Sequence, residues 1–195
     1  MKRRLAALTL VISTFALALP ARAAEPPQVL KLSDGVTSFQ LSGVGLPAMA
    51  VLAHRANFNA HSFDVFSLYI KDAAASGDAP AWQSVSIFDG DTERLNLTVS
   101  GGADCLLHDF RLVSSARPLQ LVVAERELGQ SYANAHTVTF SFYTLRKNSQ
   151  AFIGRPLYYF ERTGTQRAAR SYCDVGDAFK NELGMERYGA RANAP

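Results

Sequence analysis

Polar side chains gather between two apolar stretches in the first third of the chain. Loops with such groups often bind a ligand, because they supply donors, acceptors and charge at the ends of rigid elements. Within residues 53–64 we take five as candidate ligand- or partner-binding residues: Arg55, Asn57, Asn59, His61 and Asp64. His54 lies beside them, so the segment holds two imidazoles, two amides, a guanidinium and a carboxylate.

Each of these side chains also has a purely structural interpretation. Asn57 and Asn59 are typical of turns, where asparagine side chains satisfy nearby backbone amides. His61 and Asp64 are three residues apart, so on a strand their side chains start on opposite faces. The histidines of this segment can likewise be hydrogen-bonded loop residues instead of metal ligands. From the sequence alone, both interpretations of the segment remain open.

A second candidate pair is Asp109 and Arg111, which lie two residues apart in a predicted strand and therefore share a face. One interpretation is a ligand site, in which Arg111, or Arg55 of the first segment, holds a carboxylate through two parallel hydrogen bonds. The other is a buried ion pair between Asp109 and Arg111. We include both residues among the candidate binding residues.

The elements that must position these groups read as strands. Short apolar stretches rich in Val, Phe, Tyr and Thr alternate with Gly, Pro, Asp and Asn about every ten residues, which predicts an all-β fold. We expect an antiparallel two-sheet β-sandwich. The predicted strands are Val29 to Leu32, Ser38 to Leu41, Ala48 to Ala53, Ser62 to Ile70, Gln83 to Phe88, Leu106 to Ser114, Leu119 to Ala124, Thr137 to Leu145 and Arg155 to Phe160.

Two of these strands carry information about their faces. Along 137–145, hydroxyl-bearing residues alternate with Val138, Phe140 and Phe142, so one face should meet a core and the other water or a partner. The strand from Ser62 to Ile70 is apolar on both faces. Such a strand belongs in the middle of a sandwich or at an interface.

The C-terminal region predicts one short helix. Between Arg167 and Glu182, apolar residues recur at helical spacing up to Leu183, and Gly176 weakens the pattern. The last residues, 185–195, have little apolar content, so we expect a disordered tail. No repeat or second domain is visible, and we place one β-sandwich domain at 24–184.

The first residues predict export. Lys2, Arg3 and Arg4 precede an apolar run from Leu5 to Leu19, and a small-residue motif ending at Ala23 follows. This is the pattern of a cleavable signal peptide covering residues 1–23, which implies a periplasmic location. The apolar run is too short to span a membrane, so we expect no membrane span.

Cleavage would change the charge of the chain. Four of the 20 basic residues (Lys2, Arg3, Arg4 and Arg22) lie in the predicted leader, which leaves 16 against 17 acidic residues, a net charge near −1 instead of +3. A near-neutral protein lacks the broad positive potential that nucleic acids attract, so we expect no nucleic-acid partner.

The chain has two cysteines, Cys105 and Cys173. In an exported protein such a pair predicts a disulfide, because the periplasm is oxidising. The alternative is a catalytic thiol. Acidic neighbours, Asp104 and Asp174, argue against it because they raise a thiol's pKa and disfavour the reactive thiolate.

The polar segments resemble, in this order, the CarG-like family of periplasmic carbapenem intrinsic resistance proteins. The resemblance runs from about Val29 to Leu183. The motifs that carry it are His54 to Asp64, Gly102 to Cys105 leading to Asp109 to Leu112, Arg126-Glu127 with Ser131 to Ala133, and Tyr172 to Val175. It implies an antiparallel β-sandwich that can pair as a homodimer, and protection against a carbapenem without known hydrolysis.

One segment departs from the family pattern. Family members tend to have an acidic turn before the third strand, whereas this chain has a turn without acidic residues from Ser42 to Ala48. A calcium loop needs several oxygen ligands, and Val44 and Ala48 have no side-chain oxygen. We therefore expect no calcium role for this turn.

Enzymatic destruction of a β-lactam finds little support in the sequence. Serine β-lactamases place the nucleophilic Ser three residues before a Lys, and no Lys here has a Ser at that spacing. The four histidines show no His-x-His pair or other zinc-binding spacing. We expect a non-enzymatic protein without metal or cofactor, whose partner is a carbapenem or a cell-wall transpeptidase. A protein-interaction module unrelated to antibiotics, or less favourably a hydrolase, is the alternative.

Overall fold

The computed structural model describes residues 27–59, 61–72, 81–101, 105–115 and 118–186. The predicted signal peptide lies outside these residues, as does the tail from residue 187 onward. Met185, which the sequence assigned to the tail, is buried against the C-terminal helix. The packed part of the domain therefore extends slightly beyond the predicted boundary at residue 184.

The described chain forms a large β-sheet and one short helix, in agreement with the predicted all-β class. The elements in chain order are β1 (Gly35–Gln40), β2 (Pro47–Arg55), β3 (Phe63–Asp72), β4 (Ala81–Ser84), β5 (Ser86–Asp89), β6 (Thr92–Arg94), β7 (Leu97–Gly101), β8 (Leu106–Val113), β9 (Gln120–Arg126), β10 (His136–Lys147), β11 (Tyr158–Tyr172) and α1 (Val175–Leu183).

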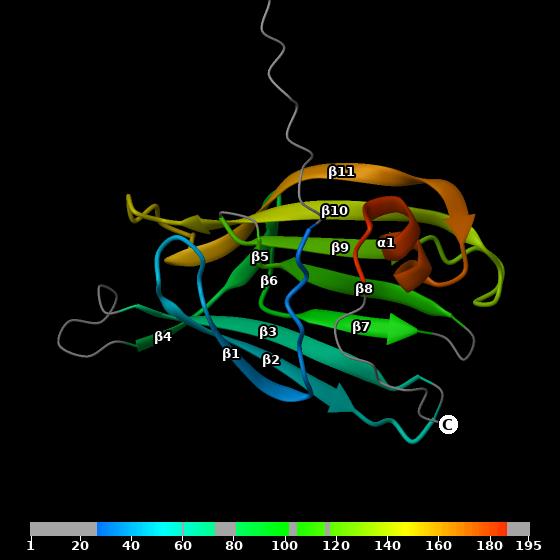
Figure 1. Cartoon of the computed structure of the whole chain (residues 1–195), viewed down its shortest axis with the longest axis horizontal. Coiled ribbons are helices and arrows are strands. Elements are labelled where there is room, and N and C mark those ends of the chain that lie inside the picture. The colour runs from blue at the N-terminus through cyan, green and yellow to red at the C-terminus, as the bar shows by residue number, and fades with distance from the viewer. Residues whose placement is uncertain (1–26, 60, 73–80, 102–104, 116–117, 187–195) are drawn as a thin grey trace, which may run out of the picture.

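The strands belong to one continuous sheet in the order β1-β2-β3-β7-β8-β9-β10-β11-β5-β6, with β4 also paired to β3. The pairing is antiparallel except between β11 and β5, which are parallel. The sheet bends so that β1 to β4 lie below β8 to β11 (Figure 1). We call β1 to β4 the lower layer and β8 to β11 the upper layer. Residues from both parts build one apolar core, so a single bent sheet achieves the two-layer packing expected of two sheets.

β3 shows how the layers meet. Phe66, Leu68 and Ile70 point into the core and are fully buried, whereas Val65 and Tyr69 on the other face are half-buried. The ring centroids of Phe66 and Phe110 of β8 lie 4.3 Å apart. The two apolar faces predicted for this strand are therefore one core face and one outer face.

α1 begins later than the sequence pattern suggested, because β11 continues to Tyr172. Asp174 caps the helix: its Oδ1 accepts a hydrogen bond from the Gly176 amide at 2.6 Å, and its Oδ2 accepts one from the Leu106 amide at 3.1 Å. α1 packs on Val138 and Phe140 of β10 through Phe179. The apolar face predicted for β10 is thus a core face beneath α1.

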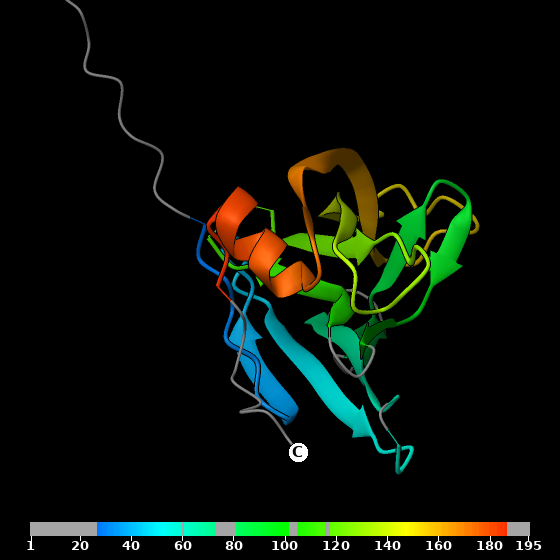
Figure 2. The same ribbon diagram turned by 90° about the vertical axis from the view of Figure 1, so that its right-hand side faces the viewer.

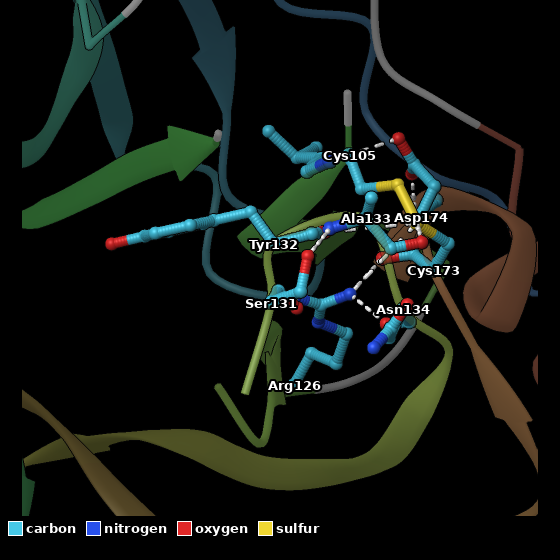
Figure 3. The surroundings of a disulfide bond; sticks show 10 residues. Cys105, Arg126, Ser131, Tyr132, Ala133, Asn134, Cys173 and Asp174 are labelled. Atoms are coloured by element: carbon cyan, nitrogen blue, oxygen red, sulfur yellow. Dashed lines mark hydrogen bonds between the residues drawn. A yellow bond between two sulfur atoms is a disulfide. The ribbon is translucent and has the colours of Figure 1, made fainter. Parts of the chain in front are cut away.

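A disulfide joins Cys105, just before β8, to Cys173, just before α1, with 5.6 Å between their Cα atoms. Arg126 lies beside it. Its Nη1 donates to the carbonyl oxygens of Asn134 and Cys173, which ties the β9–β10 connection to the disulfide (Figure 3). Arg126 is 6% exposed, so it is a buried anchor for this connection.

Among the described residues, no helix is long and apolar enough to cross a membrane.

Candidate functional site

The first candidate segment forms the connection between β2 and β3. His54 and Asp64 face each other across these strands, and His54 Nδ1 lies 2.8 Å from Asp64 Oδ1. Arg55 is exposed and its guanidinium lies over the ring of Phe63, with Cζ 5.4 Å from the centroid. The structure thus brings the two ends of the segment together as neighbouring ladder positions.

The tip of this connection is held by its own side chains. Asn57 Nδ2 donates to the His61 carbonyl at 2.9 Å, and Asn59 Oδ1 accepts from the His61 amide at 2.9 Å. Phe58 between them has a positive φ of 55° and is 99% exposed. The two asparagines therefore act as turn formers, the structural alternative considered for them.

Asp109 and Arg111 are both fully buried at 0% exposure, on the face of β8 that α1 covers. Arg111 Nη1 lies 2.6 Å from Asp109 Oδ2, and its Cζ lies 4.2 Å from the ring centroid of Phe179 in α1. A ligand arriving from solvent cannot reach this pair while α1 is in place. Their position favours the buried ion pair over the binding role.

A cavity of about 570 Å³ opens at a different place, between the β1–β2 turn and the edge of the upper layer. We call it the apolar pocket. Cavities of this size accommodate drug-sized molecules. The residues that line it are Leu41, Ser42, Gly43, Val44, Leu46, Asp72, Pro118, Leu119, Leu145, Arg146, Lys147 and Tyr158.

Three polar side chains from three strands meet in the apolar pocket. Asp72 ends β3 in the lower layer, whereas Lys147 ends β10 and Tyr158 begins β11 in the upper layer. Lys147 Nζ lies 2.9 Å from Asp72 Oδ2, and the Tyr158 hydroxyl donates to the same oxygen. This cluster links the two layers at the pocket.

Hydrogen bonding and burial, respectively, raise the pKa values of Lys147 and Tyr158 in this cluster. The hydrogen bond to Asp72 raises the pKa of the Lys147 ammonium, which stays charged at neutral pH. Burial raises the pKa of the Tyr158 hydroxyl, and its hydrogen bond to Asp72 raises it further. Arg146 adds a second cation to the lining and pairs with Glu161, with Nε 3.1 Å from Oε2.

Sequence reasoning did not select these three residues. Tyr158 lies within the predicted strand from Arg155 to Phe160, and Asp72 and Lys147 are isolated charged residues at strand ends. The available signal was the unusual turn from Ser42 to Ala48, because Ser42 to Leu46 form one wall of the apolar pocket. Gly43, Val44 and Leu46 make that wall apolar.

Within the described ranges, no three or more His, Cys, Asp or Glu side chains come together to form a metal site.

These features define an all-β domain built from one bent sheet, with a capping helix and a small-molecule-sized pocket between its layers. No protein-family model matches the chain, and no curated protein matches it in sequence. A solved structure described as the crystal structure of CarG is similar in fold, with a TM-score of 0.64 and 22% sequence identity. The match covers 79% of this chain and 94% of CarG. The chain therefore has a CarG-like fold.

Proposed function

We propose that this protein is an exported, periplasmic binding protein that captures a carbapenem in the apolar pocket without hydrolysing it, and so protects the cell by sequestration. The observation that carries the proposal is the pocket itself: a cavity of about 570 Å³ with an ammonium held inside it. The CarG-like fold supports it, together with the motifs that resemble the carbapenem resistance family.

The chemistry of the apolar pocket fits a molecule with an apolar body and one carboxylate. Leu41, Leu119 and Leu145 offer apolar contact to a ring system. The Lys147 ammonium has three donors, of which Asp72 and Tyr158 engage two, so one can reach a ligand carboxylate. Among the described residues that line the pocket there is no Cys and no His, so Ser42 has no histidine there to activate it as a nucleophile, which favours holding over cleavage.

A binding experiment with two readouts tests this function. The mature protein is titrated with a carbapenem while thermal unfolding and absorbance of the β-lactam ring are recorded. Specific binding raises the melting temperature by mass action and leaves the absorbance constant. The same drug with its carboxylate esterified should raise the melting temperature less, because Lys147 then loses its ionic partner.

Variants locate the site. Lys147→Gln should weaken binding at least tenfold, and Val44→Trp should narrow the mouth and weaken it as well. The matched control is Lys180→Gln, since Lys180 is an exposed lysine of α1 that pairs with Glu186. Equal binding by the wild type and the three variants would show that the carbapenem does not bind in the apolar pocket. Loss of ring absorbance would show that the protein is a hydrolase.

A second candidate function is protein interaction, including homodimer formation, and the outer face of the lower layer favours it. Val36 is 57% exposed and Trp82 is 43% exposed, and half-buried Val51, Val65 and Tyr69 share their face. Sedimentation of wild type and Val51→Lys distinguishes this function. A dimer lost in Val51→Lys supports it, as does protection of a purified transpeptidase that Val51→Lys abolishes.

A further inference from the structure

Two further cavities lie on the face of the upper layer that carries the apolar pocket, at the opposite end of that face. Their volumes are about 490 Å³ and 420 Å³, and both are lined by Arg94 and Glu125, so they form one groove. We call it the polar groove. β6 brings Arg94 over β10, while α1 and the β5–β6 hairpin lie on opposite sides of the sheet (Figure 2).

The polar groove lies where the residues on one face of several strands change from apolar to polar. On the shared face, β9 goes from Val123 to Glu125, and β10 goes from Tyr143 to Ser141 and Thr139. β8 changes likewise, from Phe110 to His108, and β11 contributes Arg162 and Thr165. The same face that builds the core therefore becomes a row of charged groups and hydroxyls beneath Arg94.

Three carboxylates line the polar groove, and each has a partner. Glu127 Oε1 lies 3.1 Å from Arg167 Nη2. Glu125 Oε1 lies 3.3 Å from His108 Nε2, and Asp89 Oδ1 lies 2.9 Å from Arg162 Nη1. The hydrogen bond from His108 lowers the pKa of Glu125, and the charge of Arg94 lowers it further. His108 Nδ1 contacts the Thr98 carbonyl, so both of its ring nitrogens are engaged.

Arg94 is different. Its Nη2 donates to the Tyr143 hydroxyl at 3.1 Å, yet no ion pair of Arg94 is found in the part of the chain that the structure describes. Its Nε is buried and has no hydrogen-bond partner among those residues. A buried donor without an acceptor costs free energy, so an anionic oxygen from a ligand would complete this arrangement.

We propose that the polar groove is a second ligand site, which binds a small hydroxylated carboxylate such as a sugar acid. Arg94 takes the carboxylate with its guanidinium, and the hydroxyls of Ser141 and Thr139 take the ligand's hydroxyl groups. A monoanion fits better than a dianion such as phosphate, because Glu125 and Asp89 in the groove lining repel extra negative charge. The proposal goes beyond the apolar pocket and does not depend on it.

Nuclear magnetic resonance tests the assignment, with D-galacturonate as probe and D-galactose as its uncharged match. Galacturonate should shift the Nε–H resonance of Arg94 and the amide of Ser141, whereas galactose at equal concentration should not. Arg94→Gln should raise the galacturonate Kd at least tenfold. Ser141→Val, which removes one hydroxyl, should raise it by a smaller factor. Lys180→Gln on the opposite face should leave it unchanged.

Two results would overturn the proposal. Equal affinity of wild type and Arg94→Gln for galacturonate would show that Arg94 holds no carboxylate. Tighter binding of inorganic phosphate than of galacturonate would refute the preference for a monoanion. Lys147→Gln separates the two sites: it should impair carbapenem capture in the apolar pocket and leave galacturonate binding intact.

Discussion

The apolar pocket and the polar groove lie at the two ends of one face of β10, and they use the same alternation of residues differently. Thr139, Ser141 and the largely buried Tyr143 line the groove, whereas Leu145 and Lys147 line the pocket. In the pocket a few polar groups sit within apolar walls, whereas in the groove polar groups make up most of the surface.

The difference lies in what covers each end. The lower layer packs on the pocket end, so polar groups there must satisfy one another, as Asp72, Lys147 and Tyr158 do. β6 brings Arg94 over the groove end, and Glu125 and Arg162 there keep much of their contact with water. The comparison predicts that polar substitutions cost more in the pocket than in the groove.

The largest expected effect concerns the disulfide, which lies just before β8 at the groove end. Its 68-residue separation gives a stabilisation of about 4 kcal/mol from loop entropy, so the double variant Cys105→Ala/Cys173→Ala should unfold that much more readily. Hydrogen exchange should accelerate most at the Leu106 amide, which bonds to Asp174, and less at the Val85 amide, which bonds to Leu68 near the pocket. Equal acceleration at both amides would show that the ends are not independent.

The next effect is at the pocket. Asp72 is 5% exposed, and Asp72→Ala would leave the buried Tyr158 hydroxyl without its acceptor, which should cost about 2–3 kcal/mol in urea unfolding. The matched change in the groove is Asp89→Ala, whose ion pair with Arg162 is partly exposed to water and should contribute less than about 1 kcal/mol. Equal costs would contradict the difference drawn between the two ends.

Much of the fold could be predicted because it depends on local pattern. The alternation of Val138 and Phe140 with hydroxyl residues identified the face of β10 that packs on α1, and two cysteines in a chain with a predicted leader identified the disulfide. The joining of all strands into one sheet could not be predicted, since the parallel pair of β11 and β5 connects segments about 70 residues apart. Nothing in either segment's own pattern encodes that partner.

The sites were harder to predict because sequence proximity is a poor guide to spatial clustering. The dense polar segment from His54 to Asp64 is largely a self-bonded hairpin end, and Asp109 with Arg111 is buried beneath α1. Asp72, Lys147 and Tyr158 converge from distant strands. The hydroxyl face of β10 was noticed, and it lines the groove, but its partner Arg94 comes from β6, which the sequence did not predict.

A smaller effect is expected at the boundary itself, where Val123 and Ser141 are cross-strand partners. Val123 is 1% exposed, so Val123→Thr would bury a hydroxyl within the core and should cost about 1–3 kcal/mol. Ser141→Val extends the apolar surface into the groove and should change stability by less than about 0.5 kcal/mol. Urea unfolding of both variants shows where the apolar core ends and the polar groove begins. A large loss of unfolding free energy in Ser141→Val would place this boundary elsewhere.

The smallest effect is a pH dependence in the groove. The hydrogen bond from His108, aided by the charge of Arg94, lowers the pKa of Glu125 in the folded protein. A lowered carboxyl pKa stabilises the fold above the unfolded-state pKa, and this contribution disappears as the pH falls through the folded-state pKa. The unfolding free energies of wild type and Glu125→Gln should therefore differ at pH 6 and converge toward pH 3.

Solvent screening keeps this difference small. The Glu125 side chain is 58% exposed, so the gap between wild type and Glu125→Gln should stay below about 1 kcal/mol and shrink in high salt. A gap of several kcal/mol, unaffected by salt, would mean that the groove is as enclosed as the pocket. Because an anion on Arg94 would reduce the help that Arg94 gives to Glu125, galacturonate should narrow the gap in proportion to its occupancy.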